Sequence, residues 1–239
     1  MNFRKFTGRA VALLILSTIF LTASCGLSGN KLGTVLVNNE QSGAVTYVAL
    51  GDSTGVGVGA RNGGYVSRIF ERIKHERPQS SLSNLCVSGA TTEDVLRGQV
   101  DAAVAKNPTL ITLGVGVNDI GHGFSEDKFA RNYEEILKRI RAKSNAPIVV
   151  TNIPDVSLAP VVPIAMRDGV NARVHAFNEK IEALAERYDL RVVDAYTSTH
   201  QLVPEHPEFF SADGFHPSDI GYEYWAKMMW PIVKSAIGR

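Results

Sequence analysis

Cysteine is scarce in this chain of 239 residues, which contains only Cys25 and Cys86. Two cysteines exclude a disulfide-dense framework, and they do not supply the paired spacing of a structural zinc site. The H-E-x-x-H motif of metalloproteases is also lacking. An apolar core must therefore stabilise the fold, and we expect a functional site that uses no metal and no other cofactor.

An excess of charge of one sign is lacking too, because 25 basic residues stand against 24 acidic ones and neither kind forms a block. This balance argues against nucleic acid as a partner. Apolar residues make up 44% of the chain, enough for one substantial core in a domain of about 200 residues. We expect a monomer that acts on small molecules or lipids.

Long apolar runs are lacking except near the N-terminus, where residues 10–21 follow three basic residues. This run is shorter than the roughly 20 residues that a membrane-spanning helix needs, so such an anchor is the less favoured alternative. A basic start, a short apolar run and then small residues are typical of a secretory signal peptide. We assign residues 1–24 to that signal.

The segment Leu21-Thr22-Ala23-Ser24-Cys25 resembles a bacterial lipobox, in which the cysteine is lipidated and becomes the first mature residue. The resemblance implies an exported protein of the cell envelope that is anchored to a membrane through Cys25. Secretion without an anchor is the alternative. Gly, Ser and Asn are frequent after Cys25, so residues 25–44 are predicted to hold the lipid and a flexible tether, and residues 45–239 the folded domain.

Beyond residue 45, short apolar runs alternate with amphipathic segments, a pattern that predicts a parallel sheet between two layers of helices. Two longer segments interrupt this rhythm, 153–169 and 197–214, and long ordered loops in such folds often build binding sites. Strands are expected over 46–50, 82–87, 110–114, 148–152 and 191–194, and helices over 65–77, 92–105, 126–143, 170–188 and 218–237.

The stretch GDSTGVGVGA, residues 51–60, matches two different motifs. As a dinucleotide-binding turn it needs an acidic residue at the end of the second strand, where the sequence has Cys86-Val87-Ser88. As the G-x-S-x-G elbow of an α/β-hydrolase, it needs an oxyanion loop upstream, and Ser53 instead follows the first expected strand. Neither reading fits the rest of the chain.

Polar residues follow several of the expected strands. In open α/β sheets, ligands bind where strands end, so these residues are expected to gather at one edge. Ser53, Gly89 and Asn118 follow the first three strands, and Asp213 and His216 lie three positions apart after the last.

These residues, in this order, resemble the SGNH (GDSL) hydrolase family. The resemblance rests on GDSTGVGVGA, CVSGATT, GVGVNDI and DGFHPS, and it runs from about residue 45 to the C-terminus. Thr54 departs from the leucine that often follows the serine. The resemblance implies a flavodoxin-like three-layer α/β/α fold with a five-stranded parallel sheet.

The resemblance also implies a role for each residue. A serine hydroxyl needs a base within hydrogen-bond reach, and the base needs an orienting partner. Ser53 is the implied nucleophile, His216 the base and Asp213 the orienting acid. The backbone N–H groups of Ser53 and Gly89 and the side-chain amide of Asn118 are the implied oxyanion hole.

We therefore predict a serine esterase that hydrolyses esters of short to medium acyl chains through an acyl-enzyme. Alternatives are a lysophospholipase or lipase, an acyltransferase using the same site, and a lipid-anchored binding protein whose site is vestigial. Asp52 is expected to fix the turn at the serine, and Asp119 to brace its own loop. His122 either lines the pocket or lies on the surface, and the apolar residues of 153–169 form either a pocket wall or ordinary core.

Overall fold

The computed structural model describes residues 43–238 of the chain. The predicted signal peptide, the predicted lipidation site Cys25 and the predicted tether up to residue 42 lie outside the described residues.

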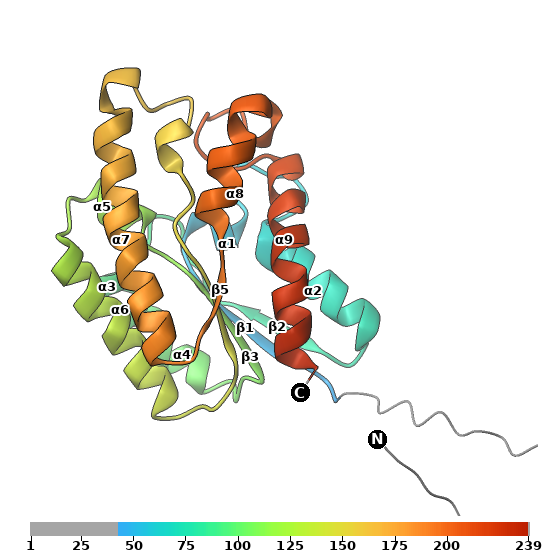
Figure 1. Cartoon of the computed structure of the whole chain (residues 1–239). Coiled ribbons are helices and arrows are strands. Elements are labelled where there is room, and N and C mark those ends of the chain that lie inside the picture. The colour runs from blue at the N-terminus through green and yellow to red at the C-terminus, as the bar shows by residue number, and fades with distance from the viewer. Residues whose placement is uncertain (1–42, 239) are drawn as a thin grey trace, which may run out of the picture. The chain divides into compact units, whose positions relative to one another are not determined.

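A single parallel sheet of five strands forms the centre of the described fold (Figure 1). Its strand order is β2-β1-β3-β4-β5, the flavodoxin-like order, so the predicted fold class is confirmed. The strands are β1 (Thr46–Gly51), β2 (Ser81–Asn84), β3 (Leu110–Gly114), β4 (Ile148–Thr151) and β5 (Arg191–Val193).

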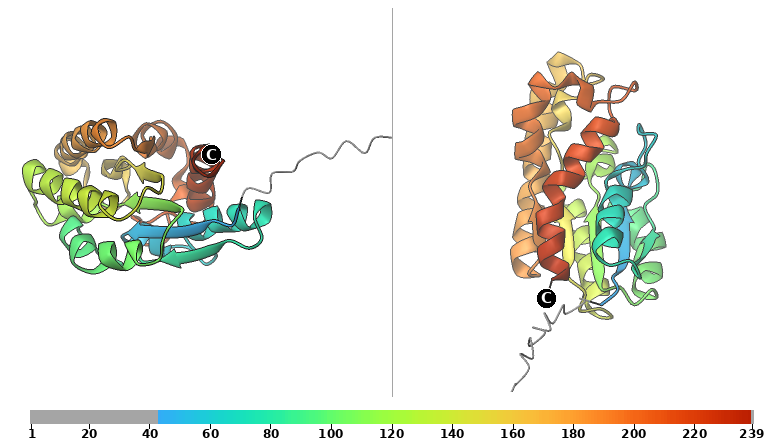
Figure 2. Two further views of the ribbon diagram at one scale, coloured as in Figure 1. Left: turned by 90° about the horizontal axis from the view of Figure 1, so that it is seen from below. Right: turned by 90° about the vertical axis from the view of Figure 1, so that its right-hand side faces the viewer.

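Helices cover both faces of the sheet (Figure 2). On one face lie α2 (Tyr65–Glu76) and α9 (Asp219–Ile237), and on the other lie α4 (Val100–Val104), α6 (Glu126–Arg141) and α7 (Arg167–Arg187). Within residues 43–238, no helix has the length and apolar character needed to cross a membrane.

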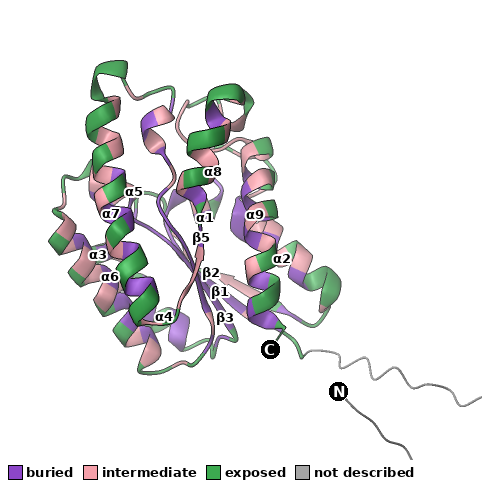
Figure 3. Ribbon diagram, viewed as in Figure 1, coloured by how far each residue is buried: buried purple, intermediate pink, exposed green. Residues whose placement is uncertain are grey.

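Burial on both faces explains why the central strands are apolar at consecutive positions. Successive side chains of a strand point to opposite faces. Tyr47 and Ala49 accordingly pack toward α2 and α9, whereas Val48 and Leu50 pack toward α4, α6 and α7. All four side chains are fully buried, as the colouring of the sheet in Figure 3 shows.

The second strand is shorter than predicted. Its ladder is disturbed at Asn84, whose side chain accepts a hydrogen bond from the backbone N–H of Cys86 at 3.2 Å. Contact with β1 nevertheless continues, because Leu85 N–H donates to Ala49 at 2.9 Å and Val87 N–H to Gly51 at 3.1 Å. The chain therefore still arrives at the end of β1, although it is no longer a regular strand.

The helix predicted over 92–105 is one helical path in three parts. A short α3 (Thr92–Asp94) leads into a wider π turn, η1 (Val95–Gln99), which is followed by α4. Thr91 caps the start, because its hydroxyl accepts from the N–H of Asp94.

The interpretation of 197–214 as a long loop was wrong at its start, where α8 (Ala195–Leu202) forms. Asp194 caps this helix by accepting from the N–H of Thr197 at 3.0 Å. Two 3-10 turns follow, η4 (Val203–Glu205) and η5 (Pro207–Phe209). The other long segment, 153–169, contains the turns η2 (Val156–Leu158) and η3 (Ile164–Met166) and passes directly into α7.

Candidate active site

Ser53 lies where β1 ends, as the first residue of the short helix α1 (Ser53–Val56). Asp52 caps this helix, accepting from the N–H of Thr54 at 2.9 Å and from its hydroxyl at 2.8 Å. Burial raises the pKa of the Asp52 carboxyl, although the hydrogen bonds from Thr54 act in the opposite direction. Asp52 therefore fixes the turn that presents Ser53, which is the role expected for it from the sequence.

His216 and Asp213 lie on a tight loop before α9. The loop is closed by a hydrogen bond from Ser211 N–H to the carbonyl of His216 at 2.8 Å, and Gly214 turns it with a φ of 68°. One carboxylate oxygen of Asp213 accepts from the backbone N–H groups of Phe215 and His216 at 2.8 and 2.9 Å. The same oxygen accepts from the Ser211 hydroxyl at 2.8 Å, so the carboxylate is held in one orientation.

A continuous chain of contacts joins the three residues. The Nε2 atom of His216 lies 2.9 Å from Ser53 Oγ, and its Nδ1 atom lies 2.7 Å from Asp213 Oδ2. Burial acts to raise the pKa of the Asp213 carboxyl, but the hydrogen bonds from His216, Phe215 and Ser211 outweigh it and hold the pKa well below its ordinary value. The imidazole thus lies between a hydroxyl group and an ionised carboxylate.

Asn118 follows β3 in the short helix α5 (Val117–Gly121) and lines the same pocket as Ser53 and His216. Its side-chain amide donates to the carbonyl of Ala90 at 3.0 Å, which joins the loop after β3 to the turn after β2. Gly89 lies on that turn with a φ of 79° and is exposed. It does not line the pocket itself and faces a neighbouring surface hollow.

Asp119 and His122 lie on the same loop and differ in burial. Asp119 is fully buried and accepts from the backbone N–H of Thr92 at 3.0 Å and from the Thr92 hydroxyl, so it braces this loop against α3. His122 is exposed, and its Nδ1 atom lies 2.8 Å from the carbonyl oxygen of Asn118. Since His122 does not line the pocket, the surface interpretation is the one that holds.

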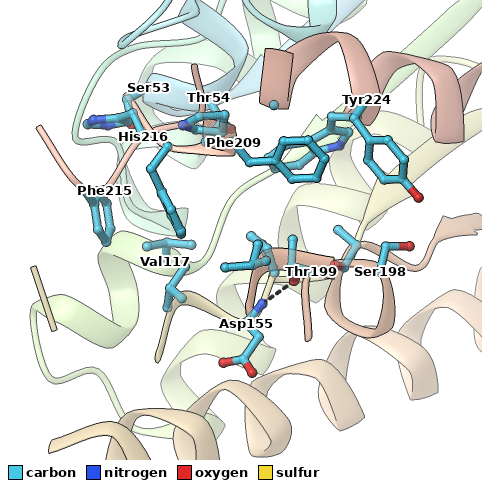
Figure 4. A pocket seen from close by; sticks show the side chains of 18 of the residues that line it. Ser53, Thr54, Val117, Asp155, Ser198, Thr199, Phe209, Phe215, His216 and Tyr224 are labelled. Carbon is cyan, nitrogen blue, oxygen red and sulfur yellow. Dashed lines mark hydrogen bonds between the residues drawn. The ribbon is translucent and has the colours of Figure 1, made fainter. Parts of the chain in front are cut away.

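The pocket beside Ser53 has a volume of about 80 Å³. In Figure 4, Ser53 and His216 lie at one end, Phe209 and Tyr224 along one wall, and Val117 and Thr199 on the opposite side. Most of the lining is apolar, so Ser53 and His216 lie at the end of a mainly hydrophobic pocket. The walls come from α8, η5, α9 and the start of the segment after β4.

The apolar segment 153–169 contributes less to the pocket than a wall would require. Only Pro154, Asp155 and Val156 of this segment line it. Ile164 and Met166, farther along, are 82% and 57% exposed. The aromatic walls were missed, although Phe209 and Tyr224 flank the His216 motif in the sequence and that proximity was the available signal.

A second histidine and carboxylate pair lies at the edge of the pocket. The Nδ1 atom of His200 is 2.7 Å from Asp155 Oδ2, and the Ser157 hydroxyl donates to the other carboxylate oxygen. Figure 4 shows the carboxylate of Asp155 pointing away from Ser53. Because Ser157 contacts the acid and not the imidazole, these three residues do not repeat the order of hydroxyl, imidazole and carboxylate.

No group of three or more His, Cys, Asp or Glu side chains within residues 43–238 is arranged to hold a metal ion. Burial raises the pKa of the Cys86 thiol above its ordinary value.

Comparison with known proteins gives consistent matches. Residues 49–224 match the model of the GDSL-like Lipase/Acylhydrolase family. Over 214 residues the chain is 26% identical to a GDSL-like esterase of Mycobacterium tuberculosis. The matched region covers 81% of this chain but only 63% of that protein. The chain is also 26% identical over 200 residues to the spore germination lipase LipC of Bacillus licheniformis, covering 74% of this chain and 91% of LipC.

Solved structures share the fold. The crystal structure of TesA superposes with a TM-score of 0.66 at 22% identity, over 80% of this chain and 99% of that one. At such low identity the likeness concerns the arrangement of sheet and helices.

Proposed function

The chain belongs to the GDSL-like lipase/acylhydrolase family, and on this premise we propose that it is a serine esterase that hydrolyses carboxylic esters through an acyl-enzyme. The observation that carries the proposal is the hydrogen-bonded series Ser53 Oγ, His216 and Asp213, with its hydroxyl end at an apolar pocket. A nucleophile in contact with a base, and a base in contact with an orienting acid, is the arrangement that acyl transfer by serine requires.

In the first half of the reaction, Ser53 Oγ bonds to the ester carbonyl carbon while its proton passes to His216 Nε2. Asp213 keeps the other imidazole nitrogen protonated and stabilises the imidazolium. When the tetrahedral intermediate collapses, the imidazolium gives its proton to the leaving alcohol. In the second half, His216 takes a proton from water, which attacks the acyl-enzyme, and the carboxylic acid leaves as Ser53 recovers its proton.

The negative charge on the tetrahedral oxygen needs fixed donors. Ser53 lies in the first turn of α1, where backbone N–H groups have no acceptor within the helix. The amide nitrogen of Asn118 carries two hydrogens, and its contact with Ala90 uses one of them. We assign these two donors to the oxyanion hole. The N–H of Gly89 is the third donor that the resemblance implies, but Gly89 lies on a turn that does not line the pocket, so its part in the hole stays a prediction.

The size of the pocket supports short acyl groups. Its volume of about 80 Å³ is smaller than the roughly 150 Å³ of an engineered apolar cavity that holds benzene. Since each buried methylene contributes about 0.8 kcal/mol, kcat/KM stops rising once the chain outgrows the pocket. We expect a series of p-nitrophenyl esters to peak at or below medium chain length. A steady rise to palmitate would favour the lipase or lysophospholipase alternative.

Substitution of the nucleophile tests the proposal. Ser53→Ala removes one oxygen from a residue at a strand end, so we expect a folded protein without esterase turnover. Ser81→Ala is the matched control, because Ser81 is exposed and begins β2, whereas Ser53 follows the end of β1. This variant should retain wild-type turnover. Esterase activity that persists in Ser53→Ala would refute the assignment.

Two alternative functions, an acyltransferase and a binding protein, can be distinguished from a hydrolase by the products formed and by turnover. An acyltransferase would form a new ester when an alcohol acceptor is added, whereas a hydrolase releases mainly the acid. A binding protein with a vestigial site would bind esters without releasing acid at all.

A further inference from the structure

We propose that Gln99 is a positioning residue for this reaction: its side-chain amide holds the backbone of Gly51 and so sets the direction in which the chain leaves β1 toward Ser53. The inference rests on the proposed function of Ser53. It assigns a task to a polar side chain that the mechanism itself does not use.

Both ends of the Gln99 amide contact the same residue. Its Oε1 atom accepts from the Gly51 N–H at 2.8 Å, and its Nε2 atom donates to the Gly51 carbonyl at 2.9 Å. Gln99 is only 3% exposed, so its amide is largely shielded from water. A buried amide is costly unless it is hydrogen-bonded, and here each polar atom has a partner.

Gly51 is a position at which such a restraint matters. Its φ is 151°, and a Cβ atom there would lie 2.3 Å from the carbonyl oxygen of Gly114, so the site requires glycine. Glycine also has the widest backbone freedom of any residue. The two hydrogen bonds from Gln99 restrain the peptide groups on both sides of the Gly51 Cα atom, two residues before Ser53.

The helical path that carries Gln99 also contacts the other parts of the site. Gln99 is the last residue of the π turn η1, and such turns are often found at functional sites. This helical path, α3 to α4, starts at Thr92, whose backbone N–H donates a hydrogen bond to Asp119, the neighbour of Asn118. Gln99 further lines the surface hollow that Gly89 faces. One segment therefore connects the end of β1 with the loops that carry the proposed oxyanion donors.

The first test is Gln99→Met, which preserves side-chain length and removes both hydrogen bonds. Gln79→Met, at an exposed turn far from Ser53 along the strands, is the matched control. We expect kcat of the folded enzyme to fall about 10- to 100-fold, because small displacements of a reacting group cost that much. The KM for a p-nitrophenyl ester should change little, and the rate of inactivation by a fluorophosphonate should fall in parallel with kcat.

The second test is Gln99→Glu, which remains informative if the methionine variant does not fold. A protonated carboxyl group can both accept from the Gly51 N–H and donate to the Gly51 carbonyl, whereas an ionised one cannot donate. We therefore expect the ratio of variant to wild-type kcat to fall as the pH rises. A residue that only stabilised the fold would lower the melting temperature and leave this ratio constant.

The outcomes separate the two claims. A folded Gln99→Met enzyme with wild-type kcat and inactivation rate overturns the positioning role, as does a ratio for Gln99→Glu that does not vary with pH. If Ser53→Ala abolishes turnover while Gln99→Met is normal, this inference alone fails. If Ser53→Ala retains turnover, the proposed function fails together with it.

Discussion

Among single residues, Asp213 shows how local hydrogen bonds fix the charge and the orientation of a carboxylate. Its two carboxylate oxygens contact His216 and two nearby backbone and hydroxyl donors, Phe215 N–H and the Ser211 hydroxyl. Hydrogen bonds to a carboxylate favour its ionised form. The acid therefore stays charged under conditions in which an ordinary aspartate would begin to take up a proton, and the imidazole keeps its orientation.

The lowered pKa of Asp213 makes a prediction about pH. Because this carboxylate remains ionised on mild acidification, its own protonation should not add a step to the pH profile. We expect kcat/KM for an activated ester to rise with pH in one step. A second ionisation near the ordinary aspartate value of about 3.9 would contradict the assigned role of Asp213.

Removal of the charge on Asp213 is the matching substitution. In Asp213→Asn the amide no longer favours the reactive tautomer of His216, so we expect kcat to fall about 10⁴-fold. Asp127→Asn, at a residue whose side chain is 80% exposed on α6, is the control. Near-normal kcat in Asp213→Asn would show that the acid does not orient the base.

Among the elements, β1 and the π turn η1 each contain a glycine, Gly51 and Gly98, but only the position in β1 requires one. Gly51 faces the carbonyl of Gly114 on β3, its register partner in the sheet. Gly98, by contrast, has open space where a side chain would begin. The backbones of β1 and β3 are therefore in close contact at this strand end. Because α1 begins only two residues after Gly51, this contact also fixes where α1 starts.

This contrast predicts different outcomes for two identical substitutions. Gly51→Ala must displace β1 from β3, so we expect a loss of stability of about 2 kcal/mol or more and a loss of esterase activity. Gly98→Ala should be neutral or stabilising by up to about 1 kcal/mol, because alanine favours helix over glycine. Chemical denaturation and ester hydrolysis measure the two effects. Equal stability of both variants would contradict the close contact at Gly51.

The strands and the proximity of Ser53 to Asn118 were predictable from the sequence for one physical reason. The carboxyl ends of parallel strands meet at one edge, so Ser53 and Asn118 could be placed together without coordinates. The pocket walls could not, because an apolar residue such as Ile164 has the same signature whether it is exposed or buried. Gln99 was also missed, since its two contacts join residues 48 positions apart.

At the scale of the whole molecule, the pocket and the entry of the chain into the fold lie at opposite ends of β1. The strand begins at Thr46 and ends at Gly51, which separates the two ends by about 17 Å at the usual rise per residue. Figure 1 shows the described chain entering at the lower end of the sheet, away from α1. The point at which the described chain enters the fold therefore lies at the end of the sheet opposite to Ser53.

We propose that Cys25 carries a lipid and that this anchor and catalysis are separable. Full-length protein should partition with membranes, whereas a variant that begins at Leu27 should be soluble and equally active on soluble esters. Membrane fractionation and a p-nitrophenyl ester assay measure the two properties. If the shortened protein is folded but inactive, residues before 43 contribute to the site.

Covalent labelling would establish whether Ser53 is the nucleophile, because it reports which atom reacts. A fluorophosphonate reacts with a serine hydroxyl only where a base activates it. After labelling of the intact protein and mass analysis of its peptides, we expect one adduct, on Ser53, and none in Ser53→Ala. An adduct on another residue, or labelling that persists in Ser53→Ala, would contradict this expectation.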